Sequence, residues 1–132
     1  VNLMELKDNL GSEKAAQTAK IFLDSFARSM PTGKQNTFAN GTLPNAIYVA
    51  LRKDQPVNLV GAFEKPVSSK EGYVDESVKA LRDHANGVYR DFVGEPSDHW
   101  CVGVEGMGQK LKLTELLTQL EETILATLKE NE

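Results

Sequence analysis

Hydrophobic positions follow a helical period in three stretches of the chain. Apolar side chains recur every three or four residues within 12–30, 74–92 and 114–128, which predicts three amphipathic helices. Ser12 is placed to cap the first helix, and Pro31 is placed to end it. The inward face of that first helix is predicted to hold Ala15, Ala19, Phe22, Leu23, Phe26 and Met30.

A period of two, typical of strands, marks the other apolar segments. Residues 46–51 and 57–63 alternate on either side of the polar turn 53–56, which predicts an antiparallel hairpin. A short strand is expected at 100–104, and residues 1–6 are interpreted as the end of an opening strand. Few strands and three helices predict an α+β fold. We expect a ferredoxin-like sheet of the RNA-recognition type, incomplete here, with helices packed on it.

Length and composition predict one globular domain over residues 1–132. The chain opens as if within a strand, so we expect this domain to be a fragment of a longer polypeptide. The net charge of −4 argues against a chain that is basic as a whole, as many nucleic-acid binders are. The single cysteine, Cys101, favours a reducing compartment such as the cytoplasm, and no apolar run reaches the ~20 residues of a membrane helix.

The connector 31–44, PTGKQNTFANGTLP, carries the most suggestive polar chemistry. No acidic residue occurs from Arg28 to Lys53, so the connector is locally cationic. Lys34 offers a charged donor, and Gln35 and Asn36 offer planar amides. Gly33 lets the backbone approach a ligand closely, and Phe38 offers a flat aromatic face. This set suits a sugar-phosphate chain, although a plain helix-to-strand connector with Phe38 in the core fits the same residues.

Patterns for catalysis or metal binding are weak. His99 and Cys101 are two residues apart, but this spacing specifies no nucleophile and base without a third, orienting group. His84 and His99 with one cysteine nearby do not make a zinc spacing, and the 106–108 Gly-Met-Gly run lacks the lysine and hydroxyl of a phosphate loop. We therefore predict no catalytic residue, no metal and no cofactor. A small-molecule enzyme that uses Cys101 and His99 is the remote alternative.

Several segments resemble, in the right order, the CasC family, the backbone subunit of the type I-E CRISPR surveillance complex Cascade. They are VNLMELKDNLG, KAAQTAKIFLDSFARSMP, GKQNTFANGTLPNAIYVAL, NLVGAFEKPV and SSKEGY. The most specific are the GKQNT-to-TLP stretch and AFEKPV. The resemblance covers nearly the whole chain but only the C-terminal portion of family members, and it is loose from about Ser97 onward.

This resemblance implies a modified RNA-recognition fold and a non-catalytic role in antiviral defence. Such subunits polymerise along one crRNA, hold its backbone without reading its sequence, and present it to a target DNA strand beside other Cascade subunits. Their basic helix and thumb would lie largely upstream of Val1, which would explain the acidic balance here. The residues predicted to contact RNA are Gly33, Lys34, Gln35, Asn36, Phe38, Lys65 and Lys70. Lys65 and Lys70 are predicted to contact the backbone of either RNA or DNA. The alternative is an assembly module that makes only subunit contacts.

Overall fold

The computed structural model describes residues 1–29, 42–68 and 70–130, and the chain divides into two compact units. The first unit is Val1–Pro44 with Lys112–Glu132, and the second is Asn45–Leu111. Each unit is described separately below. The prediction that residues 1–132 form a single domain of a longer subunit stays a prediction. None of the described helices is long and apolar enough to cross a membrane.

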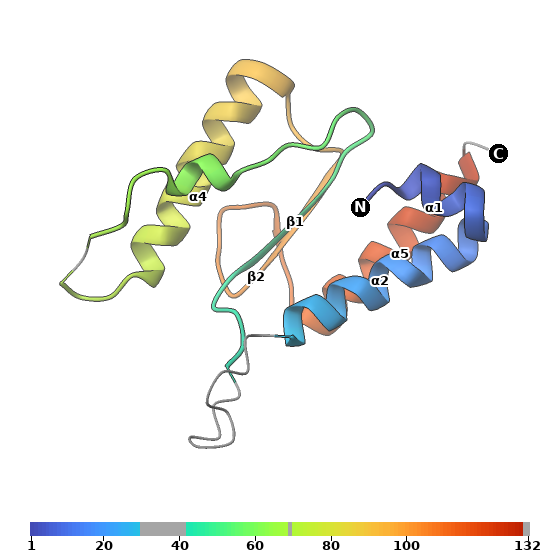
Figure 1. The fold of residues 1–132 in the computed structure, drawn as a ribbon, viewed down its shortest axis with the longest axis horizontal. Helices are drawn as coiled ribbons and strands as arrows, with labels where there is room; N and C mark the ends of the chain where they lie inside the picture. Colours follow the sequence, from blue (N-terminus) through green and yellow to red (C-terminus); the bar gives the residue numbers. More distant parts are fainter. Residues whose placement is uncertain (30–41, 69, 131–132) are drawn as a thin grey trace. The chain divides into compact units, whose positions relative to one another are not determined.

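The first unit is helical. It contains α1 (Leu3–Leu10), α2 (Ser12–Arg28) and α5 (Leu113–Glu130), with α2 and α5 side by side (Figure 1). The two long helices confirm the predicted periodicity. The predicted opening strand is wrong, because the Asn2 side chain caps a helix there and accepts hydrogen bonds from the amides of Met4 and Glu5 at 3.1 and 3.3 Å.

The core of this unit joins small side chains on α2 to large ones on α5. Alanines form the buried face of α2, and leucines with one isoleucine form that of α5: Ala15, Ala16, Ala19 and Ala27 against Leu116, Leu117, Leu120, Ile124 and Leu128. Small residues let two helices approach closely while long side chains fill the space between them. Ion pairs of Lys20 with Glu121 and of Lys129 with Glu13 also join these two helices.

Two details of the first predicted helix need correction. Phe22 and Phe26 are 54% and 71% exposed and stack on each other, with ring centroids 6.2 Å apart, instead of facing the core. The alanine face lies to one side of them and satisfies the same helical period. Gly11, with φ of 80°, is the capping residue, and Ser12 is the first helical residue and is buried. Met30 lies outside the described residues.

The second unit contains a three-stranded sheet. Its order is β1 (Ile47–Leu51), β2 (Asp98–Val102) and β3 (Gln109–Lys110), with β1 and β2 antiparallel and β2 and β3 parallel. The predicted strand at 100–104 is confirmed, but it begins and ends two residues earlier in the sequence than predicted. It ends before Gly103 because that residue has φ of 79° and a Cβ there would clash with the Asn45 carbonyl.

The predicted hairpin is wrong, because β1 pairs with β2 and residues 57–63 form no strand. Val60–Phe63 is a 3-10 helix, η1, and it is preceded by a turn in which the Asn58 side chain accepts a hydrogen bond from the Val60 amide at 2.9 Å. Val57 and Leu59 pack on the core of the unit while Val60 and Phe63 are exposed. The alternation of apolar residues therefore reflects contact with a neighbouring helix and not strand geometry.

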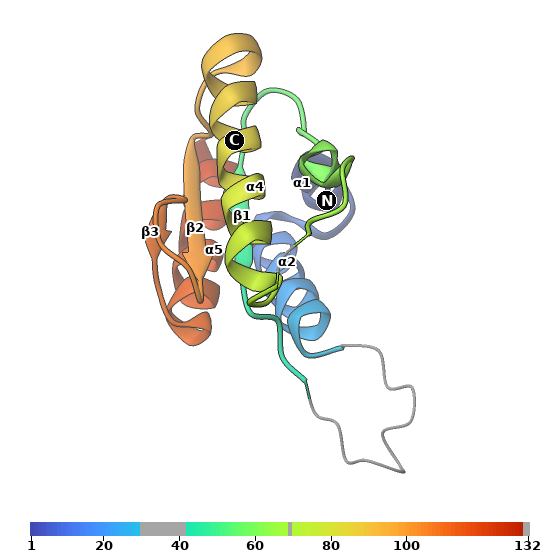
Figure 2. The ribbon, with the colours of Figure 1, turned by 90° about the vertical axis from the view of Figure 1, so that its left-hand side faces the viewer.

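That neighbouring helix is α4 (Val74–Val88), which lies against one face of the sheet (Figure 2). It continues as one π-helical turn, η2 (Tyr89–Val93), so the predicted helix over 74–92 is confirmed with a change of winding at its end. The buried centre of the unit is formed by Ala85, Tyr89, Cys101 and Met107. The α+β class with a small, incomplete sheet is as predicted.

Candidate functional site

The connector predicted to bind RNA is not described by the structure. Gly33, Lys34, Gln35, Asn36 and Phe38 lie within residues 30–41, outside the described residues, so their roles stay predictions. The described chain approaches the connector along the last turn of α2. There, the Arg28 Nε donates to Asp24 Oδ1 at 2.8 Å on an exposed face, so this cation already has an acidic partner.

Lys65 and Lys70 are exposed on the loop between η1 and α4. Neither ammonium group has a hydrogen bond or an ion pair to another residue in the described part of the chain. Lys53 and Lys79 share both properties, and all four belong to the second unit. We call Lys53, Lys65, Lys70 and Lys79 the unpaired lysines. Their charge is available to an anionic ligand without breaking an internal contact.

Other cations of the second unit are committed to internal partners. Arg90 pairs with Asp91 at 2.6 Å, Lys110 pairs with Glu105 at 2.7 Å, and Arg82 donates to the Glu105 carbonyl at 3.2 Å. The Lys110 contact holds the pKa of Glu105 below its usual value, and the Arg90 contact does the same for the pKa of Asp91. These pairs are exposed, and surface pairs of this kind contribute little to stability.

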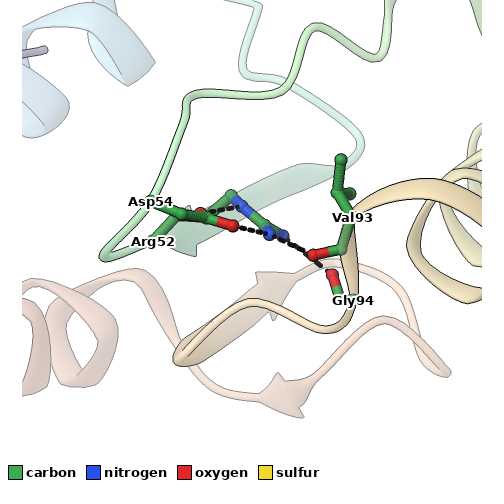
Figure 3. Close-up of polar contacts among 4 residues, drawn as sticks. All are labelled: Arg52, Asp54, Val93 and Gly94. Atoms are coloured by element: carbon green, nitrogen blue, oxygen red, sulfur yellow. Dashed lines mark hydrogen bonds and ion pairs between the residues drawn. The ribbon is translucent and has the colours of Figure 1, made fainter.

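Arg52 has the most complete set of contacts (Figure 3). Its guanidinium donates to both carboxylate oxygens of Asp54 at 2.8 and 2.7 Å, and to the carbonyls of Val93 and Gly94 at 2.8 and 3.0 Å. It also lies 5.7 Å from the centroid of the Tyr89 ring, and its side chain is only 8% exposed. The hydrogen bonds from Arg52 lower the pKa of Asp54, and those same bonds raise the pKa of Arg52. Arg52 therefore holds the end of η2 and is not a free cation beside the connector.

A pocket of about 570 Å³ lies next to Arg52 in the second unit. Its walls are mainly apolar and come from β1 and the residue after it, the segment before η1, α4, and the start of η2: Tyr48, Ala50, Arg52, Pro56, Val57, Asn58, Leu59, Leu81 and Tyr89. The volume lies in the range of pockets that hold small molecules or side chains of partners. Because Arg52 is neutralised by Asp54, the pocket presents no unpaired charge from these residues.

Three ring side chains form a hydrogen-bonded chain beside this pocket. The Tyr48 hydroxyl lies 3.1 Å from the Tyr89 hydroxyl and 3.1 Å from His99 Nδ1. Burial raises the pKa of Tyr48 well above its usual value, and the hydrogen bond with Tyr89 raises it further. Tyr48 is therefore a neutral hydrogen-bonding group at any ordinary pH.

The structure gives Cys101 and His99 separate contacts. Cys101 is fully buried in the core, and its thiol donates to the Val104 carbonyl at 3.3 Å, while His99 bonds to Tyr48. A buried thiol is not presented to a substrate. His84 lies under η1, with its ring 3.1 Å from where a Cβ on Gly61 would be. Among the described residues, no three His, Cys, Asp or Glu side chains come together as a metal site requires.

Sequence reasoning missed the pocket and the Tyr48–Tyr89–His99 chain. The predicted helix over 74–92 does contain Tyr89. However, the predicted hairpin paired β1 with residues 57–63, whereas the observed register pairs Tyr48 with Cys101 and Ala50 with His99. The missing information was the long-range pairing of β1 with β2, for which the sequence offers no local signal.

Solved structures resemble the described fold closely. A chain of a CRISPR RNA-guided surveillance complex matches 96% of this chain with a TM-score of 0.81 and 25% sequence identity. A chain of a second such complex, in a pre-nicking state, also matches 96%, with a TM-score of 0.78 and 26% identity. The matched regions are 50% and 35% of those two chains, so this sequence spans half or less of each. A comparison with curated proteins gives no match.

The family assignment comes from the sequence itself. The sequence profile of the CT1975-like proteins, a Cas family, matches residues 1–130. It confirms the predicted resemblance to a Cas-type protein, while the narrower assignment to CasC of type I-E stays a prediction. The chain belongs to the CT1975-like protein family.

Proposed function

We propose that this chain is part of a guide-RNA-binding backbone subunit of a CRISPR surveillance complex, of the CasC kind found in type I-E systems. The observation that carries the proposal is the likeness, over 96% of the chain at 25% and 26% identity, to chains of two RNA-guided surveillance complexes. In this proposal the subunit acts in the cytoplasm, copies polymerise along the crRNA, and the chain itself is not an enzyme and needs no cofactor.

The charges of the described residues support contact with a nucleic-acid backbone. The unpaired lysines are exposed in a unit whose other described cations have internal partners. Lysine ammonium groups bind phosphates as point charges and carry no sequence information. Lys65 and Lys70 would therefore hold a phosphate chain, of the crRNA or of the target DNA strand, without selecting its sequence.

The connector is the second segment proposed to contact RNA. Lys34 would pair with a phosphate, the amides of Gln35 and Asn36 would bond sugar or phosphate oxygens, and Gly33 would allow the backbone to approach. Phe38 would stack on a base. The prediction is that Lys34→Ala weakens RNA binding equally for all sequences and lowers the salt slope by roughly 0.7 per lost single-strand contact. A sequence-dependent loss, or an unchanged slope, contradicts this role.

The second candidate is an assembly module that makes no direct RNA contact. The exposed, stacked pair Phe22 and Phe26 favours it, because large apolar side chains on a helix surface are typical of protein interfaces. Ultraviolet crosslinking of RNA to the full-length protein, followed by peptide mapping, separates the two. Adducts within 33–38 or at Lys65 and Lys70 support RNA binding. Stable incorporation into the complex without adducts at these positions supports the assembly module.

A further inference from the structure

We propose that Phe63 and Tyr73 stack on bases of the strand whose phosphates Lys65 and Lys70 hold, so that the loop between η1 and α4 prefers single-stranded nucleic acid to duplex. The inference deepens the proposed function and rests on it, because it takes the phosphate contacts of the two lysines as given. The ligand of the rings is an unstacked nucleobase, which an RNA strand and a DNA strand both supply.

The two rings are the exposed aromatic side chains that lie nearest along the chain to unpaired lysines. Tyr73 is 62% exposed and Phe63 is 45% exposed. Among the exposed aromatic residues that the structure describes, only these two lie within three positions of an unpaired lysine. Phe22 and Phe26 stack on each other, and Phe92 directly follows an arginine–aspartate ion pair.

The order of residues along the loop places one lysine beside each ring. Lys65 follows Phe63 by two residues, and Lys70 precedes Tyr73 by three. An extended chain spans at most about 3.6 Å per residue, so the Cα atoms of the two pairs are separated by at most about 7 and about 11 Å. A lysine and its ring can therefore contact the phosphate and the base of one nucleotide or of adjacent nucleotides.

Ordered backbone holds the two rings at the ends of the loop, which leaves η1 and returns to α4 (Figure 1). The Tyr73 carbonyl accepts a hydrogen bond from the Ser77 amide at 3.0 Å at the start of α4. Phe63 ends η1, which sits on the His84 ring at Gly61. Neither ring has a hydrogen bond or a ring contact with another described residue. Platforms held in this way lose little conformational freedom on binding.

Charge alone would hold a strand weakly on this loop. Residues 63–76 contain two lysines and four acidic residues, Glu64, Glu71, Asp75 and Glu76. The last two lie in the first turn of α4, where the helix amides offset part of their charge, but the loop has no positive excess. Stacking does not depend on charge, and each stacked base typically contributes about 5- to 150-fold in affinity. The rings therefore supply affinity that the lysines alone do not.

Stacking also determines which form of nucleic acid the loop binds. Bases in a duplex are paired and stacked on one another, whereas bases of a single strand can turn out and stack on aromatic side chains. Every base has an aromatic face, so contacts of this kind tolerate any sequence. A duplex would contact this loop only through its phosphates and the lysines.

Matched variants test the rings. The affinity of Tyr73→Ala and of Phe63→Ala is measured by fluorescence anisotropy with single-stranded RNA, single-stranded DNA and a DNA duplex. Each variant is expected to bind single strands about 10-fold more weakly and the duplex as wild type does, which also shows that it is folded. Tyr73→Phe keeps the flat face and should bind as wild type. Phe92→Ala removes the most exposed ring of the same unit and should change nothing. Equal affinities of Tyr73→Ala and Phe92→Ala, or equal losses for single strand and duplex, would overturn the proposal.

Salt dependence separates the rings from the lysines. Tyr73→Ala and Phe63→Ala should keep the wild-type slope of log affinity against log salt, because stacking releases no counterion. Lys70→Ala should lower that slope by roughly 0.7. A lowered slope in Tyr73→Ala would mean that the variant acts through the lysines, and would contradict the stacking role.

A strand with abasic sites in place of its bases provides the last check. Wild type and Tyr73→Ala are expected to bind this strand equally, since it offers no base to the ring, and a persistent difference would overturn the proposal. Losses with RNA alone assign the rings to a guide RNA, and losses with DNA assign them to a target strand as well. If Lys70→Ala lowers the slope while the ring variants bind as wild type, the inference fails and the proposed function stands. If the wild-type chain binds no single strand, both fail.

Discussion

Arg52 shows how one side chain shapes the second unit. It joins the end of β1 to the end of η2 through four hydrogen bonds, two to Asp54 and two to backbone carbonyls. We expect Arg52→Ala to lower the free energy of unfolding by about 1–2 kcal/mol. The loss is smaller than for a fully buried charged residue, because water can reach the carbonyls that Arg52 leaves. Urea unfolding followed by the fluorescence of the only tryptophan, Trp100, reports on this unit.

The control for that prediction is Arg90→Ala. Arg90 makes the same kind of bidentate contact, with Asp91, but its side chain is 75% exposed and bonds no distant part of the chain in the described structure. The Arg90 variant should unfold at the wild-type urea concentration. Equal losses in both variants would show that the carbonyl contacts of Arg52 are unimportant.

Asp54 makes part of this contribution dependent on pH. Its pKa in the folded protein is lowered below the ordinary value of 3.8, mainly by the hydrogen bonds from Arg52. Its contribution to stability is therefore fully present above the unfolded pKa and is lost as the pH falls through the folded pKa. We expect the difference in urea midpoint between wild type and Asp54→Asn to be constant from about pH 5 to 7 and to shrink below about pH 4. A difference that persists unchanged down to about pH 2.5 would contradict this account.

At the scale of elements, helices were predictable and strand pairing was not. The period of 3.6 residues located α2, α4 and α5 because each carries apolar residues at helical spacing, although α4 buries only Ala85 fully. It did not tell which apolar residues face inward, since the alanine and phenylalanine faces of α2 share that period. Residues 57–63 look like a strand because apolar residues alternate there, but only Val57 and Leu59 pack on the core while Phe63 is exposed. An irregular segment produces such a pattern equally well.

Gly61 shows why that segment is not a strand. A Cβ at this position would be 3.1 Å from the His84 ring, so η1 sits directly on the imidazole. We expect Gly61→Val to lower the free energy of unfolding by about 1 kcal/mol, because the His84 ring must move to admit the new side chain. In a His84→Ala background the same substitution should cost clearly less. Equal costs in the two backgrounds would show that the ring does not set the position of η1.

The candidate site was predictable only where its chemistry is local. Lys65 and Lys70 are recognisable from the sequence as basic residues in a polar loop, and the structure places both on the surface. The pocket depends on β1, α4 and residues 56–59, and no local pattern joins segments so distant along the chain. Arg52 lies in the stretch from Arg28 to Lys53 that lacks acidic residues, but its partners Val93 and Gly94 lie about forty residues away along the chain and are visible only in the fold.

For the whole molecule, net charge is a poor guide to the ligand. The chain carries −4 overall, and five glutamates against two lysines occupy residues 112–132 of the first unit. The second unit holds the four unpaired lysines, although its acidic residues also outnumber its basic ones. Phosphate binding depends on the cations that can reach the backbone, and charges more than about one Debye length away, ~8 Å at physiological salt, are largely screened. An acidic chain can therefore hold a polyanion on one unit.

The salt dependence of RNA binding tests whether the unpaired lysines hold the polyanion. If Lys65 and Lys70 each contact a phosphate of a single strand, replacing both by Ala should lower the slope of log affinity against log salt by roughly 1.4, about 0.7 for each contact. The loss should be equal for RNAs of different sequence, because phosphates carry no base information. Lys14→Ala removes an exposed lysine of the first unit and should leave the slope at its wild-type value. The change in slope caused by Lys14→Ala is compared with half of the change caused by the double variant. If the two are equal, general charge and not the unpaired lysines governs binding.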